Sequence, residues 1–366
     1  MIIPFNDFKK EYEINKKSID VAVKRVFTSG YFILGKEVED FEKAFAKYLG
    51  VKHVIGVGNG MEAIQIALMA IGIKRGDEVI TTSLSACATA VAIKLVGARP
   101  VFVDIDDYYH IDPREIEKKI SSKTKAILPV HLYGQSADMA KISAIAKKYN
   151  LHIIEDCAQA HGTKFKGKKV GSLGTAGCFS FYPTKNLGTY GDGGAIATNN
   201  SRLANVMKMM RNYGQKNRYE HVIIGINSRL DAIHAAILSV KLKKLNDLNK
   251  KRNALAKVYR KQLQSVKQVK LPLKRKGSNH IYHQFVIEVE RRDALQKYLE
   301  KKGITTLIHY PIPIHKQESF FKFNSLRLST VEKSVKNIIS LPCHPYLSLK
   351  EVEFISKNIK LFYDSK

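Results

Sequence analysis

A lysine in the segment SFYPTKNL (residues 180–187), followed at once by GDGG (191–194), has a setting that could support covalent chemistry. A lysine held among apolar neighbours loses solvation of its charge, so its pKa falls and its free amine can form an imine with an aldehyde. The flanking stretches 176–181 and 194–198 are apolar and predict two short strands. We therefore expect Lys185 on a loop between strands. A lone lysine in so lysine-rich a chain is more often a surface residue, and further signals are needed.

An acidic pair ends the apolar run from Leu151 to Ile154, in the stretch IIEDCAQAHG (153–162). Open α/β sheets bind their ligands at the carboxyl ends of their strands. An enzyme that uses pyridoxal phosphate needs one acid beside the pyridine nitrogen, and Asp156 is the candidate. The alternative is that Glu155 and Asp156 only solvate the end of the strand.

The stretch HVIGVGNGMEAIQIAL (53–68) predicts a strand, a glycine-rich turn and a helix. The start of a helix presents unpaired N–H groups and a positive dipole, so this turn suits a phosphate. It matches neither the dinucleotide-binding pattern nor the Walker pattern.

The stretch GINSRLD (225–231) opens a helical pattern that we expect to run from about residue 227 to 262. Asn227 or Ser228 could bind a ligand there, or simply cap the helix.

Taken in order, these segments resemble the DegT/StrS family of pyridoxal-phosphate-dependent nucleotide-sugar aminotransferases. The resemblance spans nearly the whole chain. The other segments that match the family are SGYFILG (29–35), GARPVFVD (97–104), PVHLYGQ (129–135), HYPIPIH (309–315) and SLP (340–342).

The resemblance implies a role for each matching residue. Lys185 would carry the imine with pyridoxal 5'-phosphate, Asp156 would face the pyridine nitrogen, and Gln159 would lie against the ring near its hydroxyl. An amino acid, expected to be glutamate, and a keto-sugar nucleotide would react in turn, which predicts ping-pong kinetics. The phosphate would be held by Ser180 and by the amides of Gly60 and Met61.

The resemblance also implies a homodimer with shared active sites, in which Asn227 reaches from the partner subunit to the phosphate. Tyr219, His309 and Tyr310 match positions near the nucleotide-sugar in the family.

Two positions depart from the common family pattern. Met61 stands where many relatives have threonine, and it resembles enzymes that aminate C3 of dTDP-3-keto-6-deoxyhexoses. Ala86 stands where an aromatic residue usually stacks on the cofactor, so the family pattern does not fix which sugar is the substrate. The alternatives are amination at C4 of a UDP-, dTDP- or GDP-4-keto sugar, and the dehydratase branch, which has histidine in place of Lys185.

The rhythm of strands and helices predicts an α/β fold, a mainly parallel sheet flanked by helices, as in fold type I of pyridoxal-phosphate-dependent transferases. We expect a large cofactor-binding domain over 1–247 and a small C-terminal α+β domain over 248–366. In the small domain, the pattern predicts strands at 282–289 and 304–310 and a helix at 292–302.

The charge balance raises a hypothesis from another class. The chain has 61 basic and 33 acidic residues, a net charge of +28, which attracts polyanions. A nucleic-acid-binding regulator on an enzyme-like fold is therefore the rival. The lysines are dispersed and no nucleic-acid-binding motif is present, so we expect no nucleic-acid partner.

The four cysteines lack metal-site or disulfide spacing, so we expect no metal and a reducing compartment. No signal-peptide layout and no long apolar run is seen, and we expect a cytoplasmic protein with no membrane partner.

Overall fold

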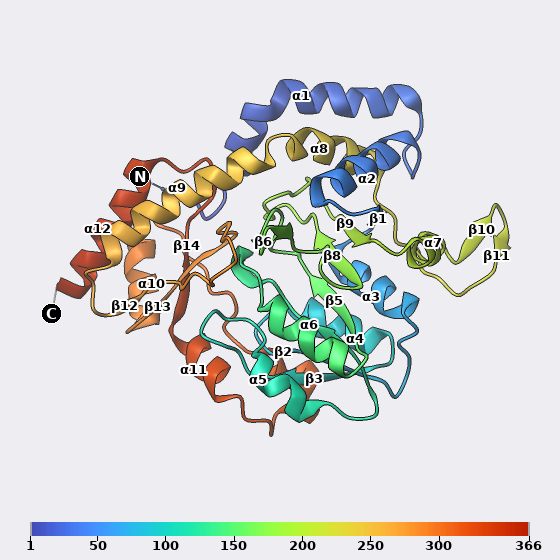
Figure 1. Ribbon diagram of the computed structural model, residues 1–366. Helices are drawn as coiled ribbons and strands as arrows, with labels where there is room; N and C mark the ends of the chain where they lie inside the picture. The colour runs from blue at the N-terminus through green and yellow to red at the C-terminus, as the bar shows by residue number, and fades with distance from the viewer. Residues whose placement is uncertain (1, 365–366) are drawn as a thin grey trace.

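The computed structural model describes residues 2–364, and its centre is a seven-stranded sheet (Figure 1). The strand order is β1-β9-β8-β5-β4-β2-β3. The strands are β1 (His53–Val57), β2 (Glu78–Thr82), β3 (Arg99–Val103), β4 (Thr124–Leu128), β5 (His152–Asp156), β8 (Ala176–Ser180) and β9 (Gly194–Thr198).

All the strands of this sheet except β9 run in the same direction. β9 lies antiparallel to both β1 and β8, and the other neighbouring pairs are parallel. The predicted mainly parallel sheet is therefore confirmed. As a result, the carboxyl ends of six strands and the start of β9 share one edge, which is where open α/β sheets place ligands.

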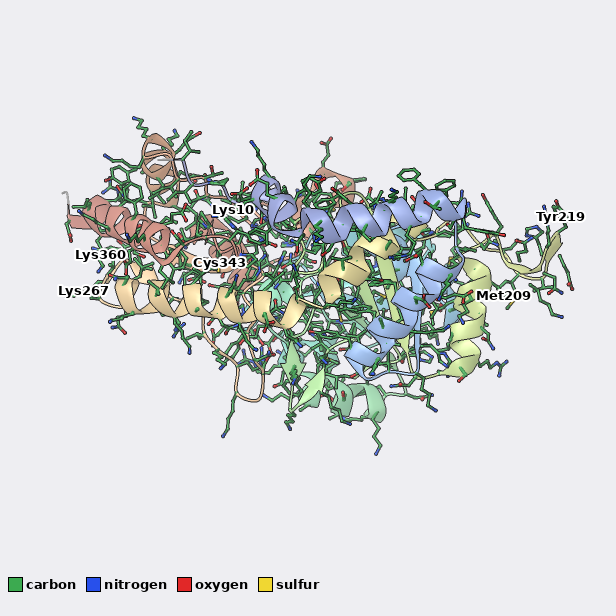
Figure 2. All side chains as sticks on the ribbon, turned by 90° about the horizontal axis from the view of Figure 1, so that it is seen from above. Lys10, Met209, Tyr219, Lys267, Cys343 and Lys360 are labelled. Carbon is green, nitrogen blue, oxygen red and sulfur yellow. The ribbon has the colours of Figure 1, made fainter. Side chains whose placement is uncertain are left out.

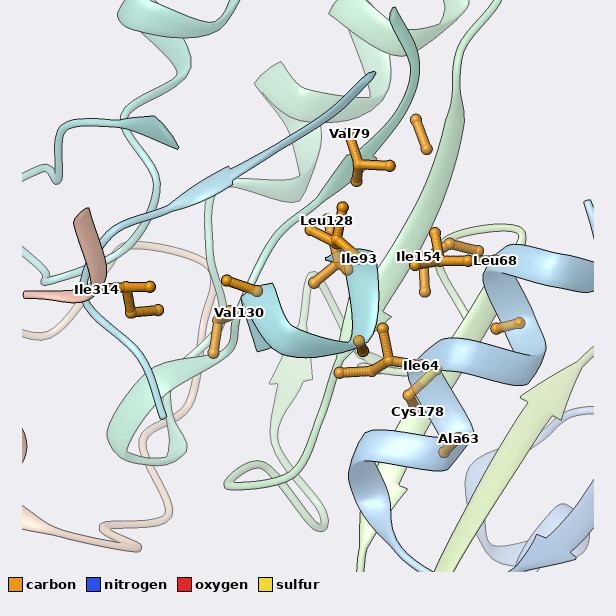
Figure 3. Packing of buried hydrophobic residues seen from close by; sticks show 14 of the residues in the cluster. Ala63, Ile64, Leu68, Val79, Ile93, Leu128, Val130, Ile154, Cys178 and Ile314 are labelled. Carbon is orange, nitrogen blue, oxygen red and sulfur yellow. The ribbon is translucent and has the colours of Figure 1, made fainter. Parts of the chain in front are cut away.

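Helices cover both faces of the sheet because consecutive strand residues point to opposite sides. On one face α3 (Gly60–Ala70) and α4 (Ala88–Leu95) pack against residues such as Leu128 and Ile154 (Figure 3). On the other face, Ile127 and Ile153 pack against α6 (Met139–Lys148), and the β1 end of the sheet packs against α2 and α8. The other helices of this part of the chain are α1 (Phe8–Ser29), α2 (Lys36–Leu49), α5 (Pro113–Ile116), α7 (Ser201–Met210) and α8 (Ala232–Leu242).

A second core lies around a three-stranded antiparallel sheet in the C-terminal part of the chain. The strand expected over 282–289 is observed at Phe285–Val289. The division of the chain near residue 247 stays a prediction; that residue lies inside α9. The elements are α9 (Leu245–Leu263), β12 (Val269–Lys270), β13 (Phe285–Val289), α10 (Arg292–Lys301), α11 (Ser329–Asn337), β14 (Ile338–Leu341) and α12 (Leu349–Asp364).

The prediction of one long helix over residues 227–262 was wrong. The chain forms two helices, because α8 packs against α1 and α2 whereas α9 packs against α12, and the chain turns between them at residues 243–244. The first helix begins only after Asp231, so neither Asn227 nor Ser228 caps it.

The strand predicted over 304–310 is also absent. Residues Ile304 and Leu307 make only isolated bridges, to Ile3 and Ser340. The segment pairs with Ile3, which precedes the first helix, and with Ser340 in β14, so it forms no continuous strand ladder.

A hairpin arm projects from the body of the molecule between α7 and α8 (Figures 1 and 2). It contains β10 (Gln215–Asn217) and β11 (Glu220–His221), and Tyr219 lies at its outer end (Figure 2).

The helices described between residues 2 and 364 include none with the length and apolar character needed to cross a membrane.

Candidate active site

Lys185 lies on the loop between β8 and β9, at the edge of the sheet where the strands end, as the sequence predicts. Its backbone N–H donates to the carbonyl of Tyr182 (2.9 Å), which closes a tight turn. The side chain is half-buried. Burial lowers the pKa of the amine from 10.5 to about 8, although the charge of Asp156 acts in the opposite direction. At a pKa of about 8, roughly a tenth of this amine is unprotonated at pH 7.

Asp156 ends β5 and is buried at the same edge. Burial raises the pKa of its carboxyl, while hydrogen bonds to the charged form lower it. Its Oδ1 accepts from the N–H of Ala158 (3.1 Å) and its Oδ2 accepts from the hydroxyl of Thr89 (2.8 Å). The carboxylate is thus oriented by two donors.

Thr89 was not among the predicted site residues. It belongs to α4 and is joined through its hydroxyl to that of Ser85, at 2.8 Å. No local sequence signal points to it, because its partner Asp156 is 67 positions away and the contact arises only when β5 and α4 meet. Ala86 lies in the same turn and is half-buried.

Gln159 connects the large sheet to the loop that follows residue 308. Its Oε1 accepts from the N–H of Tyr133 (2.7 Å), and its Nε2 donates to the phenolic oxygen of Tyr310 (3.1 Å). Burial raises the pKa of Tyr310 above its usual value, so the phenol is neutral. The amide of Gln159 is thereby fixed on both sides.

His309 is half-buried beside the same site. Its Nδ1 lies 2.9 Å from the hydroxyl of Ser340, and its carbonyl accepts from the hydroxyl of Tyr133. Burial and, to a lesser extent, the positive charge of Lys185 lower its pKa to about 4, so the ring is neutral at pH 7. The structure therefore brings His309 and Tyr310 to Lys185 and Asp156.

A glycine-lined cradle is formed where the start of α3 meets the end of β8. Asn59 caps α3 through Oδ1, which accepts from the N–H of Glu62 (2.9 Å). A Cβ on Gly60 would lie 2.6 Å from the Cβ of Ser180, and one on Gly194 would lie 2.4 Å from the carbonyl of Asn59. Only glycine allows this approach, which brings the first N–H groups of α3 beside the hydroxyl of Ser180. Met61 is the second residue of the helix and is half-buried.

Asn227 and Tyr219 do not join the other predicted site residues within one chain. Asn227 is exposed and pairs through its backbone with Asn212, while Tyr219 is 80% exposed on the hairpin arm. The role predicted for Asn227 involves a second subunit, and the role predicted for Tyr219 stays a prediction. The adjacent Ser228 has a structural role, since its hydroxyl accepts from the N–H of Gly58 (2.9 Å).

A buried group of possible metal ligands lies beneath the site, made by His131, Glu155 and Cys157. The two oxygens of Glu155 already accept from three N–H groups within residues 171–174, and Oε2 also lies 3.0 Å from Nε2 of His131. The Nδ1 of His131 accepts from the N–H of Ala137 (3.1 Å), and burial raises the pKa of the Cys157 thiol well above its usual value. Since the ligand atoms are occupied or protonated, we interpret the group as a structural network.

The residues at this edge fit pyridoxal phosphate. The amine of Lys185 suits its aldehyde, the buried carboxylate of Asp156 suits the pyridine nitrogen, and the cradle at the start of α3 suits the phosphate. A Cβ at Gly60 would block that cradle. This steric observation supports the phosphate site without any appeal to the family resemblance.

Comparison with known proteins gives matches along the whole chain. A transaminase of Aneurinibacillus thermoaerophilus named for dTDP-3-amino-3,6-dideoxy-alpha-D-galactopyranose is 47% identical over 364 residues, 99% of both chains. A "Pleiotropic regulatory protein" of Geobacillus stearothermophilus is 45% identical over 99% of both chains. A solved structure of S. venezuelae DesV in complex with a ketimine intermediate superimposes with a TM-score of 0.98, at 39% identity, covering 100% of this chain and 99% of that one.

The family model that matches residues 13–360 is that of the DegT/DnrJ/EryC1/StrS aminotransferases. With the geometry around Lys185, this match identifies the chain as a member of that family and as an aminotransferase that depends on pyridoxal phosphate.

Proposed function

We propose that this enzyme transfers an amino group from glutamate to C3 of a dTDP-3-keto-6-deoxyhexose. The observation that carries the proposal is the 47% identity, over 99% of both chains, to a transaminase whose name specifies a dTDP-3-amino-3,6-dideoxy sugar. Met61 at the start of α3 supports the same substrate class. Amination at C4 is the alternative, and it is less favoured because the sugar in this relative's name carries its amine at C3.

Pyridoxal phosphate, when bound, supplies an aldehyde that takes up the amino group and a ring that withdraws electrons from the substrate carbon. Lys185 holds the cofactor between turnovers. Its amine, with a pKa of about 8, can take a proton from the donor carbon and return one to the acceptor carbon.

Asp156 would keep the pyridine nitrogen protonated by placing a buried negative charge beside it. Thr89 and the N–H of Ala158 hold this carboxylate in one orientation. Gln159, fixed between Tyr133 and Tyr310, would line the ring near its hydroxyl.

We also propose a homodimer in which the hairpin arm of each subunit completes the site of the other. The arm is supported as an interface by its exposed apolar side chains: Tyr219 is 80% exposed, Ile224 85% and Val222 48%. An isolated protomer would expose these to water at a cost in free energy. Asn227 lies at the base of this arm, where it could reach a partner's phosphate cradle.

Mixed dimers test this arrangement. If Lys185 and Asn227 of one site come from different subunits, mixing inactive Lys185→Ala and Asn227→Ala subunits yields one intact site in each heterodimer. Statistical mixing then restores roughly a quarter of the wild-type activity, since half of the dimers are mixed and half of their sites are intact. Mixed samples that stay as inactive as the separate variants would contradict the shared site.

The reaction is tested with a panel of 3-keto and 4-keto nucleotide sugars incubated with enzyme and glutamate. We expect products aminated at C3, identified by mass and by NMR, and parallel lines in double-reciprocal plots as ping-pong kinetics require. The purified enzyme should absorb at roughly 400–430 nm, a band of the lysine-bound cofactor. Lys185→Ala should lose it, and an adduct after borohydride reduction should map to position 185. Amination at C4 alone, or no turnover of any keto sugar, would refute the substrate assignment.

The rival from another class is a nucleic-acid-binding regulator. The net charge of +28 and a relative named as a regulatory protein favour it. It predicts tight DNA binding that weakens steeply with salt, by a colourless protein. The family match over residues 13–360 favours the enzyme. We further propose a cytoplasmic location, in keeping with the four unpaired cysteines.

A further inference from the structure

A buried chain of hydrogen bonds lies outside the residues assigned above. Ser83, the residue after β2, has its Oγ 2.5 Å from Nδ1 of His315, and Nε2 of His315 lies 3.0 Å from Oε1 of Glu332. Ser83 and His315 are both fully buried. A ring nitrogen that faces a carboxylate carries the proton, so Nε2 donates to Glu332 and Nδ1 accepts from the hydroxyl of Ser83.

The three residue types are those of a hydrolase triad, but their setting excludes that role. A nucleophilic serine needs space for a substrate beside its oxygen. Ser83 is 0% exposed, and its backbone carbonyl accepts from the N–H of Ile314 (2.9 Å), which closes the site further. This chain of hydrogen bonds therefore has a structural role and not a nucleophilic one.

The two ends of this chain lie on different parts of the molecule. Glu332 belongs to the first turn of α11, and its carboxylate also accepts from the N–H of Leu328 (3.2 Å). The start of α11 is fastened to the main sheet a second time, because Asp104, after β3, accepts from the N–H groups of Thr330 and Val331 at 2.8 and 2.9 Å. His315 joins this anchored helix to the end of β2.

His315 ends the loop 309–315 that begins with His309 and Tyr310. The other end of the loop is held by the contacts of Tyr310 to Gln159 and of His309 to Ser340. Between them, Ile314 is buried in the main core, in the same cluster as Val130 (Figure 3). Loss of the Ser83–His315 contact would loosen the end of the loop that is not held by site residues, although the backbone bond from Ile314 to Ser83 would remain.

We propose that His315 is a positioning residue: through Ser83 and Glu332 it holds the loop 309–315 so that His309 and Tyr310 meet the sugar-nucleotide acceptor. This inference rests on the proposed function, since it assigns the loop to the acceptor. The amino donor is smaller and carries no nucleotide, so its half-reaction needs the loop less.

The test compares the two half-reactions by stopped-flow absorbance in Ser83→Ala and His315→Asn. Ser83→Ala leaves Nδ1 of His315 without its donor; His315→Asn keeps an acceptor for Ser83 and loses the bond to Glu332. A matched control is Ser356→Ala, which removes another fully buried serine hydroxyl, one that donates to the carbonyl of Val352 (2.8 Å) in α12.

We expect the acceptor concentration at half-saturation to rise about five- to tenfold in Ser83→Ala. The donor half-reaction and the absorbance band of the bound cofactor should stay within about twofold of wild type. Ser356→Ala should leave both half-reactions unchanged. Equal losses in both half-reactions, or no change in either, would overturn the proposal. Failure of the proposed function would instead appear in the wild-type enzyme, as the absence of turnover with any keto-sugar nucleotide.

Discussion

Replacing Lys185 by methionine should stabilise the cofactor-free protein at pH 7 while abolishing its activity. The reason is that burial lowers the pKa of this amine from 10.5 to about 8, so the folded state holds a poorly solvated charge. At 1.36 kcal/mol per pKa unit, this penalty is at most about 3 kcal/mol. Because the side chain is only half-buried, we expect a gain of about 1 to 2 kcal/mol.

The gain should depend on pH in a defined direction. Below pH 8 the amine is protonated in both the folded and the unfolded chain, and the wild type bears the full penalty. Between pH 8 and 10.5 the unfolded chain binds the proton that the folded chain has lost, so wild-type stability rises with pH. The advantage of Lys185→Met should therefore shrink above pH 8 and vanish near pH 10.5.

Urea unfolding of both cofactor-free proteins, at several pH values between 7 and 10, measures this difference. Lys241→Met is the control, and we expect it to lower the free energy of unfolding. Lys241 is a buried lysine paired with Glu11, whose carboxylate would be left buried without its partner. A Lys185→Met protein that is no more stable than wild type at pH 7, or whose gain is constant with pH, would refute the reasoning.

Three further outcomes follow from the geometry of the site. Asp156→Asn should lower kcat in both half-reactions roughly a hundredfold or more, because a neutral amide cannot keep the pyridine nitrogen protonated; retained activity in stopped-flow assays would contradict this. Thr89→Val removes the hydroxyl that lowers the pKa of Asp156, so the acid limb of the kcat/KM profile should move to higher pH, and an unmoved limb would argue against it. Gly60→Ala places a Cβ 2.6 Å from that of Ser180, and cofactor affinity, measured by absorbance titration, should fall roughly tenfold; unchanged affinity would show that the cradle lies elsewhere.

The parts of the site that are continuous in sequence could be predicted from the sequence. The strand, turn and helix over 53–68 show a clear periodicity, and β8 and β9 are apolar stretches on either side of Lys185. Asp156 was found because an acid at the end of a buried run marks the edge of a parallel sheet. Each of these predictions uses only neighbouring residues.

The contacts made through space could not be predicted in the same way. Ser83 and His315 are 232 positions apart, and their residue types are common in any core turn. The break at residues 243–244 has no glycine or proline; it arises because α8 and α9 pack on different partners. The segment 304–310 has strand-like residues, but it is held by Ile3 on one side and Ser340 on the other. Tertiary packing overrides local preference in both cases.

The glycine cradle has a consequence for how this active site could be altered. At Gly60 and Gly194 even one added methyl group collides with backbone or Cβ atoms of Asn59 or Ser180, so these positions leave no room for variation. Ala86 and Met61, by contrast, are half-buried side chains beside the same site. Directed evolution toward new sugars should therefore find its productive changes at these two positions and along the hairpin arm, while the phosphate anchor stays constant.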